Sequence, residues 1–154
     1  MSETAPHVMV VEARFYEDVA DALREGAVGA LEAAGATYES FAVPGALEAP
    51  AAIAMALDAE RAQGRRRFDG YVALGCVIRG ETTHYDYVCG ESARGLQSLA
   101  IEHALPVANG ILTCENRDQA MDRARKDRRD KGGVAVRTCL EMIALKASLG
   151  QSRS

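Results

Sequence analysis

A dense group of polar residues stands near the middle of the chain, between Gly75 and Tyr87. Gly80 permits the backbone to approach a ligand closely, and the free N–H groups of Glu81 and Thr82 at an expected helix start suit a phosphate. His84 falls in the first turn of that helix, where the positive end of the helix dipole disfavours an imidazolium cation. A neutral imidazole beside an anion site indicates proton transfer on a phosphorylated substrate. The alternative is that the same residues only cap the helix, and their spacing does not decide between the two.

Two other loops carry residues suited to an organic ligand. Phe15 follows the first apolar run, and its ring could stack on a planar heterocycle or only anchor the next helix. Glu48 follows the second apolar run and could accept hydrogen bonds from sugar hydroxyls, or could simply be favoured in a helix first turn. The basic stretch 123–131 is interleaved with Asp and lacks aromatic residues, which favours a solvated helix face over a nucleic-acid site. Single cations in it could still reach a phosphate.

Short strands and amphipathic helices must position these loops. Four apolar runs rich in β-branched residues predict strands buried on both faces, at 8–11, 38–43, 71–74 and 107–112. Apolar residues at helical spacing predict helices at 19–34, 45–62, 83–104 and 117–128, and a last one from about residue 134. Alternating strands and helices require right-handed crossovers and a parallel sheet. The sequence therefore predicts an α/β fold: a three-layer α/β/α sandwich whose four-stranded parallel sheet has a flavodoxin-like order.

Local signals mark the ends of these elements. Gly35 and Gly64 are expected to end the first two helices, and Asn116 to cap the fourth. Thr82 and Thr83 are cap candidates for the third. In the last helix one face is expected to carry Ala135, Cys139, Met142 and Leu149. One domain is expected over 1–154, with a short loose tail at 151–154.

Composition excludes several classes of function. The chain has 154 residues, too few for two full domains, and 18 Lys and Arg against 22 Asp and Glu give a net charge of −4. No basic field is present to attract nucleic acid or an anionic membrane. Neither a membrane-spanning run nor a signal peptide is recognisable, so a cytoplasmic location is expected. The four cysteines form no Cys-x-x-Cys pair; they predict reduced, buried thiols and no metal site.

Four segments together resemble those of lumazine synthases, the penultimate enzymes of riboflavin biosynthesis. They are Arg14-Phe15, the Val-Pro-Gly-Ala-Leu-Glu run at 43–48, the Val-Ile-Arg-Gly-x-Thr-Thr-His-Tyr-Asp-Tyr-Val run at 77–88, and Asn-Gly-Ile-Leu-Thr at 109–113. The resemblance covers nearly the whole chain. It implies two small-molecule substrates and no cofactor: 5-amino-6-(D-ribitylamino)uracil and 3,4-dihydroxy-2-butanone 4-phosphate condense to 6,7-dimethyl-8-ribityllumazine, with loss of phosphate and water.

The resemblance also implies roles for individual residues. Phe15 would stack on the uracil ring, and His84 would move protons. The backbone at Cys76, Val77 and Ile78 would bind the polar edge of the uracil ring. The ribityl chain would be lined by Ala46, Leu47 and Glu48. At the phosphate it places the backbone N–H groups of Glu81 and Thr82, and the Arg123 guanidinium.

Members of that family form rings of five, with each active site between neighbouring subunits. The resemblance implies that the neighbour supplies Asn109, Arg123 and Lys131, so that a monomer would be inactive. Some members pack twelve rings into a shell, but the segment between Arg123 and Lys131 lacks the Gly-rich pattern of many shell-formers. A free pentamer or paired pentamers are therefore expected. Three alternatives remain: a non-catalytic flavin or lumazine binder, a signalling domain of the same strand order, and a shell or scaffold protein.

Overall fold

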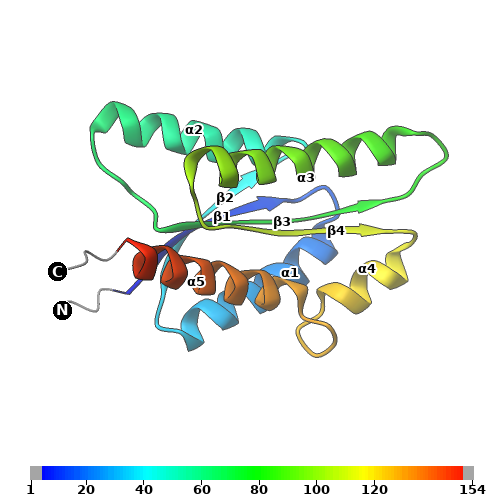
Figure 1. The fold of residues 1–154 in the computed structure, drawn as a ribbon. Helices are drawn as coiled ribbons and strands as arrows, with labels where there is room; N and C mark the ends of the chain where they lie inside the picture. The colour runs from blue at the N-terminus through cyan, green and yellow to red at the C-terminus, as the bar shows by residue number, and fades with distance from the viewer. Residues whose placement is uncertain (1–4, 151–154) are drawn as a thin grey trace.

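A computed structural model describes residues 5–150. Within this range, four strands form one parallel sheet in the order β2-β1-β3-β4 (Figure 1). The strands are β1 (His7–Ala13), β2 (Thr37–Val43), β3 (Gly70–Ile78) and β4 (Val107–Cys114). The predicted parallel α/β sheet is confirmed. The tail expected at 151–154 lies outside the described residues.

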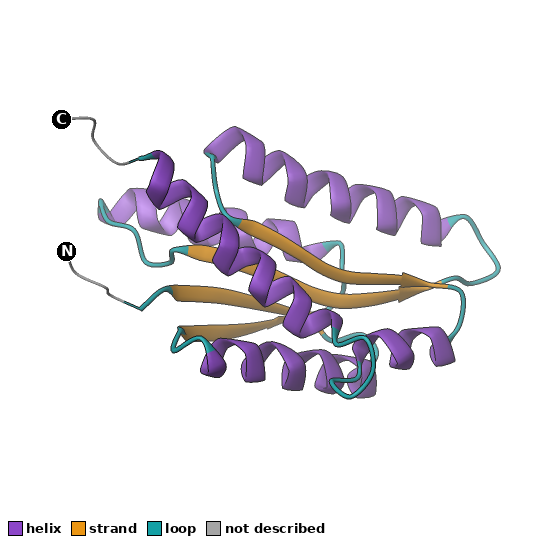
Figure 2. Ribbon diagram, turned by 60° about the horizontal axis from the view of Figure 1, so that its bottom comes forward, coloured by secondary structure: helices purple, strands orange, loops and turns teal. Residues whose placement is uncertain are grey.

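Helices cover both faces of the sheet, which confirms the three layers (Figures 1 and 2). One face carries α1 (Glu17–Ala33), α4 (Arg117–Ala124) and α5 (Lys131–Leu149), and the other carries α2 (Glu48–Gln63) and α3 (His84–His103). Alternate residues of β1 point into the two cores: Val8 and Val10 into the first, Met9 and Val11 into the second. Burial of the central strands on both faces fixes the register of the strands, and this sets where the loops at their ends begin.

Several helix ends follow the predicted signals. Gly35 and Gly64 have φ angles of +70° and +71° just after α1 and α2, a conformation that suits glycine. The Asn116 side chain accepts a hydrogen bond of 2.9 Å from the backbone N–H of Gln119, as a helix cap does. Thr83 precedes α3 without capping it through its side chain; instead the Thr82 hydroxyl accepts a bond of 3.3 Å from the His84 N–H.

The third strand is longer than predicted. Residues 76–78, expected in a loop, continue β3 and pair with residues 112–114 of β4. The predicted strand stops at residue 74, just before Gly75, but a Cβ at Gly75 would lie 2.9 Å from the Ala13 side chain. This glycine therefore permits close packing inside the sheet rather than a turn.

The boundary between the last two helices was also predicted wrongly. α4 ends at Ala124 instead of 128, because Arg125 is extended and the chain turns, with the Asp130 N–H donating to the Arg125 carbonyl oxygen at 3.0 Å. The Asp130 side chain then accepts from the Gly133 N–H at 3.2 Å, so α5 begins at Lys131, before the predicted start near 134.

Burial differs from prediction at the edges of the fold. Ala135 and Cys139 are buried, but Met142 and Leu149 on the same helix are 43% and 77% exposed. The edge strands β2 and β4 are only partly buried, since each has a neighbour on one side alone. All four cysteines are free thiols; three are buried and Cys89 is half-buried. No helix within residues 5–150 is long and apolar enough to cross a membrane.

The close approach of α1 and α5 yields a stability prediction. A Cβ at Gly132 would overlap the Leu23 carbonyl oxygen and lie 3.0 Å from its carbon and 3.2 Å from the Ala27 nitrogen, all rigid backbone atoms. Gly132→Ala should therefore destabilise the protein by about 1–3 kcal/mol, as overpacking of a core does. The measurement is the thermal midpoint at matched protein concentration.

Gly90 of α3 is the matched control, because a Cβ there would meet nothing within 4 Å. Gly90→Ala should raise the thermal midpoint, since alanine is favoured in helices by about 0.5–1 kcal/mol. Equal midpoints for the two variants would contradict the packing argument.

Candidate active site

A cavity of about 490 Å³ opens at the carboxyl ends of β1, β2 and β3. Its walls are the last residues of β3, the loops that follow the three strands, and the first turns of α2 and α3. The chain leaves β1 toward one face of the sheet and β3 toward the other, so the loops diverge and leave a crevice (Figure 1). The volume is that of a site for a small organic ligand.

Nine of the predicted site residues line this cavity. The sequence analysis placed them after three different strands, and the fold brings them together. They are Phe15, Ala46, Leu47, Glu48, Cys76, Val77, Ile78, Thr82 and His84. The side chain of Glu81 does not line the cavity.

The β1 and β2 loops supply an aromatic ring and a carboxylate. Phe15 is 73% exposed and meets the edge of the Tyr16 ring, with centroids 5.0 Å apart and an interplanar angle of 80°. Both faces of an exposed ring can take a planar ligand. Glu48 is the first residue of α2 and lies exposed on the cavity wall. It can accept hydrogen bonds from hydroxyl groups.

The loop between β3 and α3 supplies hydrogen-bond donors and the imidazole. His84, the first residue of α3, is exposed at the cavity. Within the described chain, no acceptor is bonded to the backbone N–H of Glu81 or Thr82. These donors stand at the positive end of the helix dipole, so the loop can bind an anion beside a group that transfers protons.

Arg79 fixes this loop to the rest of the fold. Its backbone N–H donates to the Cys114 carbonyl oxygen at 2.9 Å, and its Nε lies 3.1 Å from both carboxylate oxygens of Glu115. The guanidinium also stands 4.3 Å from the centroid of the Tyr85 ring. These contacts hold the segment that carries His84.

Cys76 lies in the cavity wall but is not an activated nucleophile. Burial, with the neighbouring Cys114 thiol as a smaller cause, raises the pKa of Cys76 to about 12. The thiolate is therefore scarce at neutral pH. Among the lining residues that sequence reasoning selected, His84 and Glu48 carry the side chains that can transfer protons.

Three predicted site residues lie in a different place. Asn109, Arg123 and Lys131 line a second cavity of about 320 Å³ beside β4, α4 and α5, which shares no lining residue with the first. The Asn109 side chain accepts from the Ile111 N–H at 2.9 Å, and the Arg123 guanidinium donates to the Gln119 carbonyl oxygen at 3.1 Å. Within one chain, these residues do not join Phe15 and His84.

The structure adds lining residues that sequence reasoning did not select. Tyr85 and Val88 follow His84 on α3 and face the first cavity. Helical spacing from His84 to Val88 is a signal that could have found Val88. Tyr16, Pro44, Gly45 and Gly80 complete the lining. Among residues 5–150, no group of three His, Cys, Asp or Glu is arranged to hold a metal ion.

The parallel sheet and the position of its cavity define a flavodoxin-like α/β protein with a cavity of small-molecule size at the point where the strand order reverses. Residues 5–147 match the family model described as 6,7-dimethyl-8-ribityllumazine synthase, and the chain belongs to this family.

Individual relatives agree with the family model over nearly their whole length. The chain is 60% identical to 6,7-dimethyl-8-ribityllumazine synthase of Agrobacterium fabrum, over 94% of this chain and 97% of the relative. It is 58% identical to the synthase 1 of Rhizobium meliloti, over 96% and 95% of the two chains. It is 53% identical to the synthase of Bartonella tribocorum, again over 96% and 95%.

Proposed function

We propose that the chain condenses 5-amino-6-(D-ribitylamino)uracil with 3,4-dihydroxy-2-butanone 4-phosphate, releasing phosphate and water to form 6,7-dimethyl-8-ribityllumazine. The observation that carries the proposal is the first cavity, where an exposed aromatic ring, a carboxylate and an imidazole meet beside free backbone N–H groups. Each of these groups suits one part of the two substrates. Membership of the family supports the same reaction.

The uracil substrate would occupy the side of the cavity formed by β1, β2 and β3. Phe15 would stack on the ring, and the backbone of Cys76, Val77 and Ile78 would bind the polar edge. The ribityl chain would run past Ala46 and Leu47, with its hydroxyls donating to Glu48.

The phosphate of the second substrate would bind at the start of α3. The backbone N–H groups of Glu81 and Thr82 would donate hydrogen bonds to it, and the positive end of the α3 dipole would favour its negative charge. This places the butanone carbons near His84, the first residue of the same helix. The phosphate site and the proton-transfer group are therefore fixed by one segment.

The reaction itself needs alignment and proton transfer more than a strong nucleophile. The uracil amine attacks the ketone to form an imine with loss of water; a carbon then loses a proton as phosphate is eliminated, and the ring closes with loss of a second water. His84 would accept and return protons in these steps. Holding two substrates in contact supplies much of the remaining rate enhancement.

We further propose that the chain forms a ring of five in which the second cavity of one subunit faces the first cavity of its neighbour. Asn109, Arg123 and Lys131 would then complete the site across the interface. Support comes from the cavities themselves: two cations suited to a phosphate line one, and the imidazole and aromatic ring line the other.

The direct test is lumazine formation, followed by absorbance when the purified protein meets both substrates, with the spontaneous reaction subtracted. A rate that scales with protein concentration supports the enzyme. No rate above background, with the lumazine still bound, would favour a non-catalytic binder on the same scaffold and contradict the proposal.

His84→Ala should slow turnover by roughly 10²–10⁴-fold or less, because lost acid–base help has this cost and the chemistry retains its substrate alignment. The ring should still assemble, since the His84 side chain is exposed. Steady-state rates and sedimentation measure the two effects. Full activity would remove His84 from the mechanism.

Arg123→Ala should raise the KM for the butanone phosphate far more than the KM for the uracil substrate, because only the former carries a phosphate. Each KM is measured with the other substrate saturating. Equal increases in the two values would refute the assignment of Arg123 to the phosphate.

A mixing experiment tests the shared site. At a low concentration of the butanone phosphate, His84→Ala and Arg123→Ala proteins that are unfolded and refolded together should be more active than either alone, because some interfaces then pair an intact His84 with an intact Arg123. Native mass spectrometry verifies that mixed rings form. Mixed rings without recovered activity would mean that both residues serve one site from one chain.

A further inference from the structure

The ring of Phe15 has little support of its own. It is 73% exposed, and its aromatic contact is with the edge of the Tyr16 ring. A ring that stacks on a planar ligand must nevertheless be held at one angle, because a loss of alignment lowers both affinity and rate. The constraint on Phe15 must therefore come from the backbone on either side of it.

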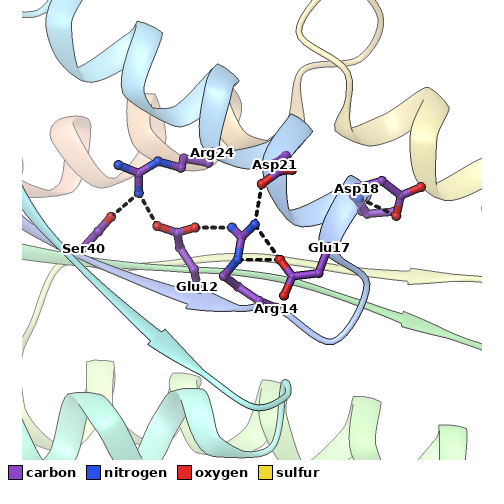
Figure 3. Close-up of polar contacts among 8 residues, drawn as sticks. Glu12, Arg14, Glu17, Asp18, Asp21, Arg24 and Ser40 are labelled. Atoms are coloured by element: carbon purple, nitrogen blue, oxygen red, sulfur yellow. Dashed lines mark hydrogen bonds and ion pairs between the residues drawn. The ribbon is translucent and has the colours of Figure 1, made fainter.

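Arg14, the preceding residue, bridges three carboxylates (Figure 3). Its Nη1 donates to Glu12 at 2.6 Å, its Nε donates to Glu17 at 3.0 Å, and its Nη2 contacts Glu17 at 2.8 Å and also Asp21. All three guanidinium nitrogens are engaged. The side chain thus ties the end of β1 to the first two turns of α1, across the residue that carries the ring.

The Arg14 backbone is fixed as well. Its N–H donates to the Val43 carbonyl oxygen at 3.2 Å, which joins the loop after β1 to the end of β2. Tyr16, the N-cap residue of α1, makes no side-chain capping bond. The Arg14 contacts therefore contribute to the position of the start of α1.

Glu12 anchors the network in the fold. It is only 5% exposed, and its second carboxylate oxygen pairs with Arg24, whose Nη1 also donates to the Ser40 hydroxyl at 2.8 Å (Figure 3). A buried carboxylate that loses a partner is costly, so this pairing resists rearrangement. Hydrogen bonding to Asp21, partly opposed by burial, raises the pKa of Arg14, which keeps its charge throughout.

A second clamp lies on the other side of Phe15. The Arg117 guanidinium stands 5.5 Å from the centroid of the Tyr16 ring and pairs with Asp18 of α1. Tyr16 is in turn the ring against which Phe15 rests. Both residues next to Phe15 are therefore held by arginine contacts, while the Phe15 ring itself stays free for a ligand.

We propose that Arg14 is a positioning residue: by bridging Glu12, Glu17 and Asp21 it holds Phe15 at the angle that stacks on the uracil ring. The inference rests on the proposed function, which places that ring against Phe15. Arg14 does not line the cavity, and its charge is matched by carboxylates, so it acts through Phe15 rather than on substrate.

The test is a double-mutant cycle on the KM for the uracil substrate and on the Kd for 6,7-dimethyl-8-ribityllumazine. Arg14→Lys leaves one side-chain nitrogen in place of the three that bind the carboxylates. It should raise both the KM and the Kd roughly tenfold, because part of the affinity that stacking on Phe15 contributes would be lost. The KM for the butanone phosphate should stay within about twofold. In a Phe15→Ala background, Arg14→Lys should change nothing further.

The same increase in both backgrounds would show that Arg14 acts independently of Phe15 and would overturn the inference, as would an unchanged KM in the parent. If Arg14→Lys does not fold, Asp21→Ala replaces it; this change removes the second-turn acceptor of Arg14 and leaves the Glu12 pair. A smaller increase with the same non-additivity is expected there.

Arg94→Lys is the matched control, since Arg94 forms an exposed pair with Glu91 on α3 away from the cavity. It should leave every constant unchanged. The Kd distinguishes failure of this inference from failure of the proposed function. If the parent protein binds lumazine but shows no turnover, the proposed enzymatic function is refuted. The double-mutant cycle measured on the Kd still tests the role of Arg14 in that case.

Discussion

The parallel arrangement of β1 and β3 is the constraint from which the site follows. Right-handed crossovers bring the carboxyl ends of all four strands to one edge, and the order β2-β1-β3-β4 reverses the direction of winding between β1 and β3. The loop after β1 therefore leads to α1 on one face and the loop after β3 to α3 on the other (Figure 1). A crevice between these loops is a consequence of topology, and the residues on them need only have the right chemistry.

Chemistry at this crevice depends on rigid loops, because the groups that reach it are few and simple. Two arginines do the holding: Arg14 fixes the β1 loop to α1, and Arg79 fixes the β3 loop to Glu115 beyond β4. The Arg14 network includes the buried carboxylate of Glu12. The free energy lost in removing this carboxylate from water is about as large as the free energy gained from its ion pairs. The value of the network therefore lies in geometry more than in stability, in keeping with a reaction that requires alignment of two substrates.

Features encoded by neighbouring residues could be predicted from the sequence. The strands, the Gly35 and Gly64 stops and the Asn116 cap each depend on a few consecutive residues, and the structure has all of them. Of the nine predicted residues that line the cavity, Phe15, Glu48, Thr82 and His84 could be selected because the ends of parallel strands meet at one edge of the sheet. The other five came from the resemblance to a known family. The resemblance also supplied their individual roles.

The wrong predictions depend on contacts between residues that lie far apart in the sequence. Gly75 continues β3 because Ala13 of a different strand packs against it, and this neighbour is invisible in a local pattern. Met142 and Leu149 have helical spacing with Cys139, yet the face of α5 that packs on the core continues from Cys139 to Ile143 and leaves both of them exposed. Tyr85 and Val88 line the cavity because the first turns of α3 form part of its wall, a placement set by tertiary packing.

The exposed outer edge of the sheet at β4 favours assembly into the proposed ring on structural grounds, in addition to the chemical ones. β4 is an edge strand with exposed positions, and the Asn109 side chain accepts from the Ile111 N–H there. Exposed edges invite pairing with other chains, so proteins cover or blunt them. A neighbour placed over β4 would cover this edge and, in the same contact, set Arg123 and Lys131 against the free N–H groups and His84 of the other chain. One interface would then meet both needs, and separating the phosphate-binding cations from the imidazole would make catalysis depend on assembly.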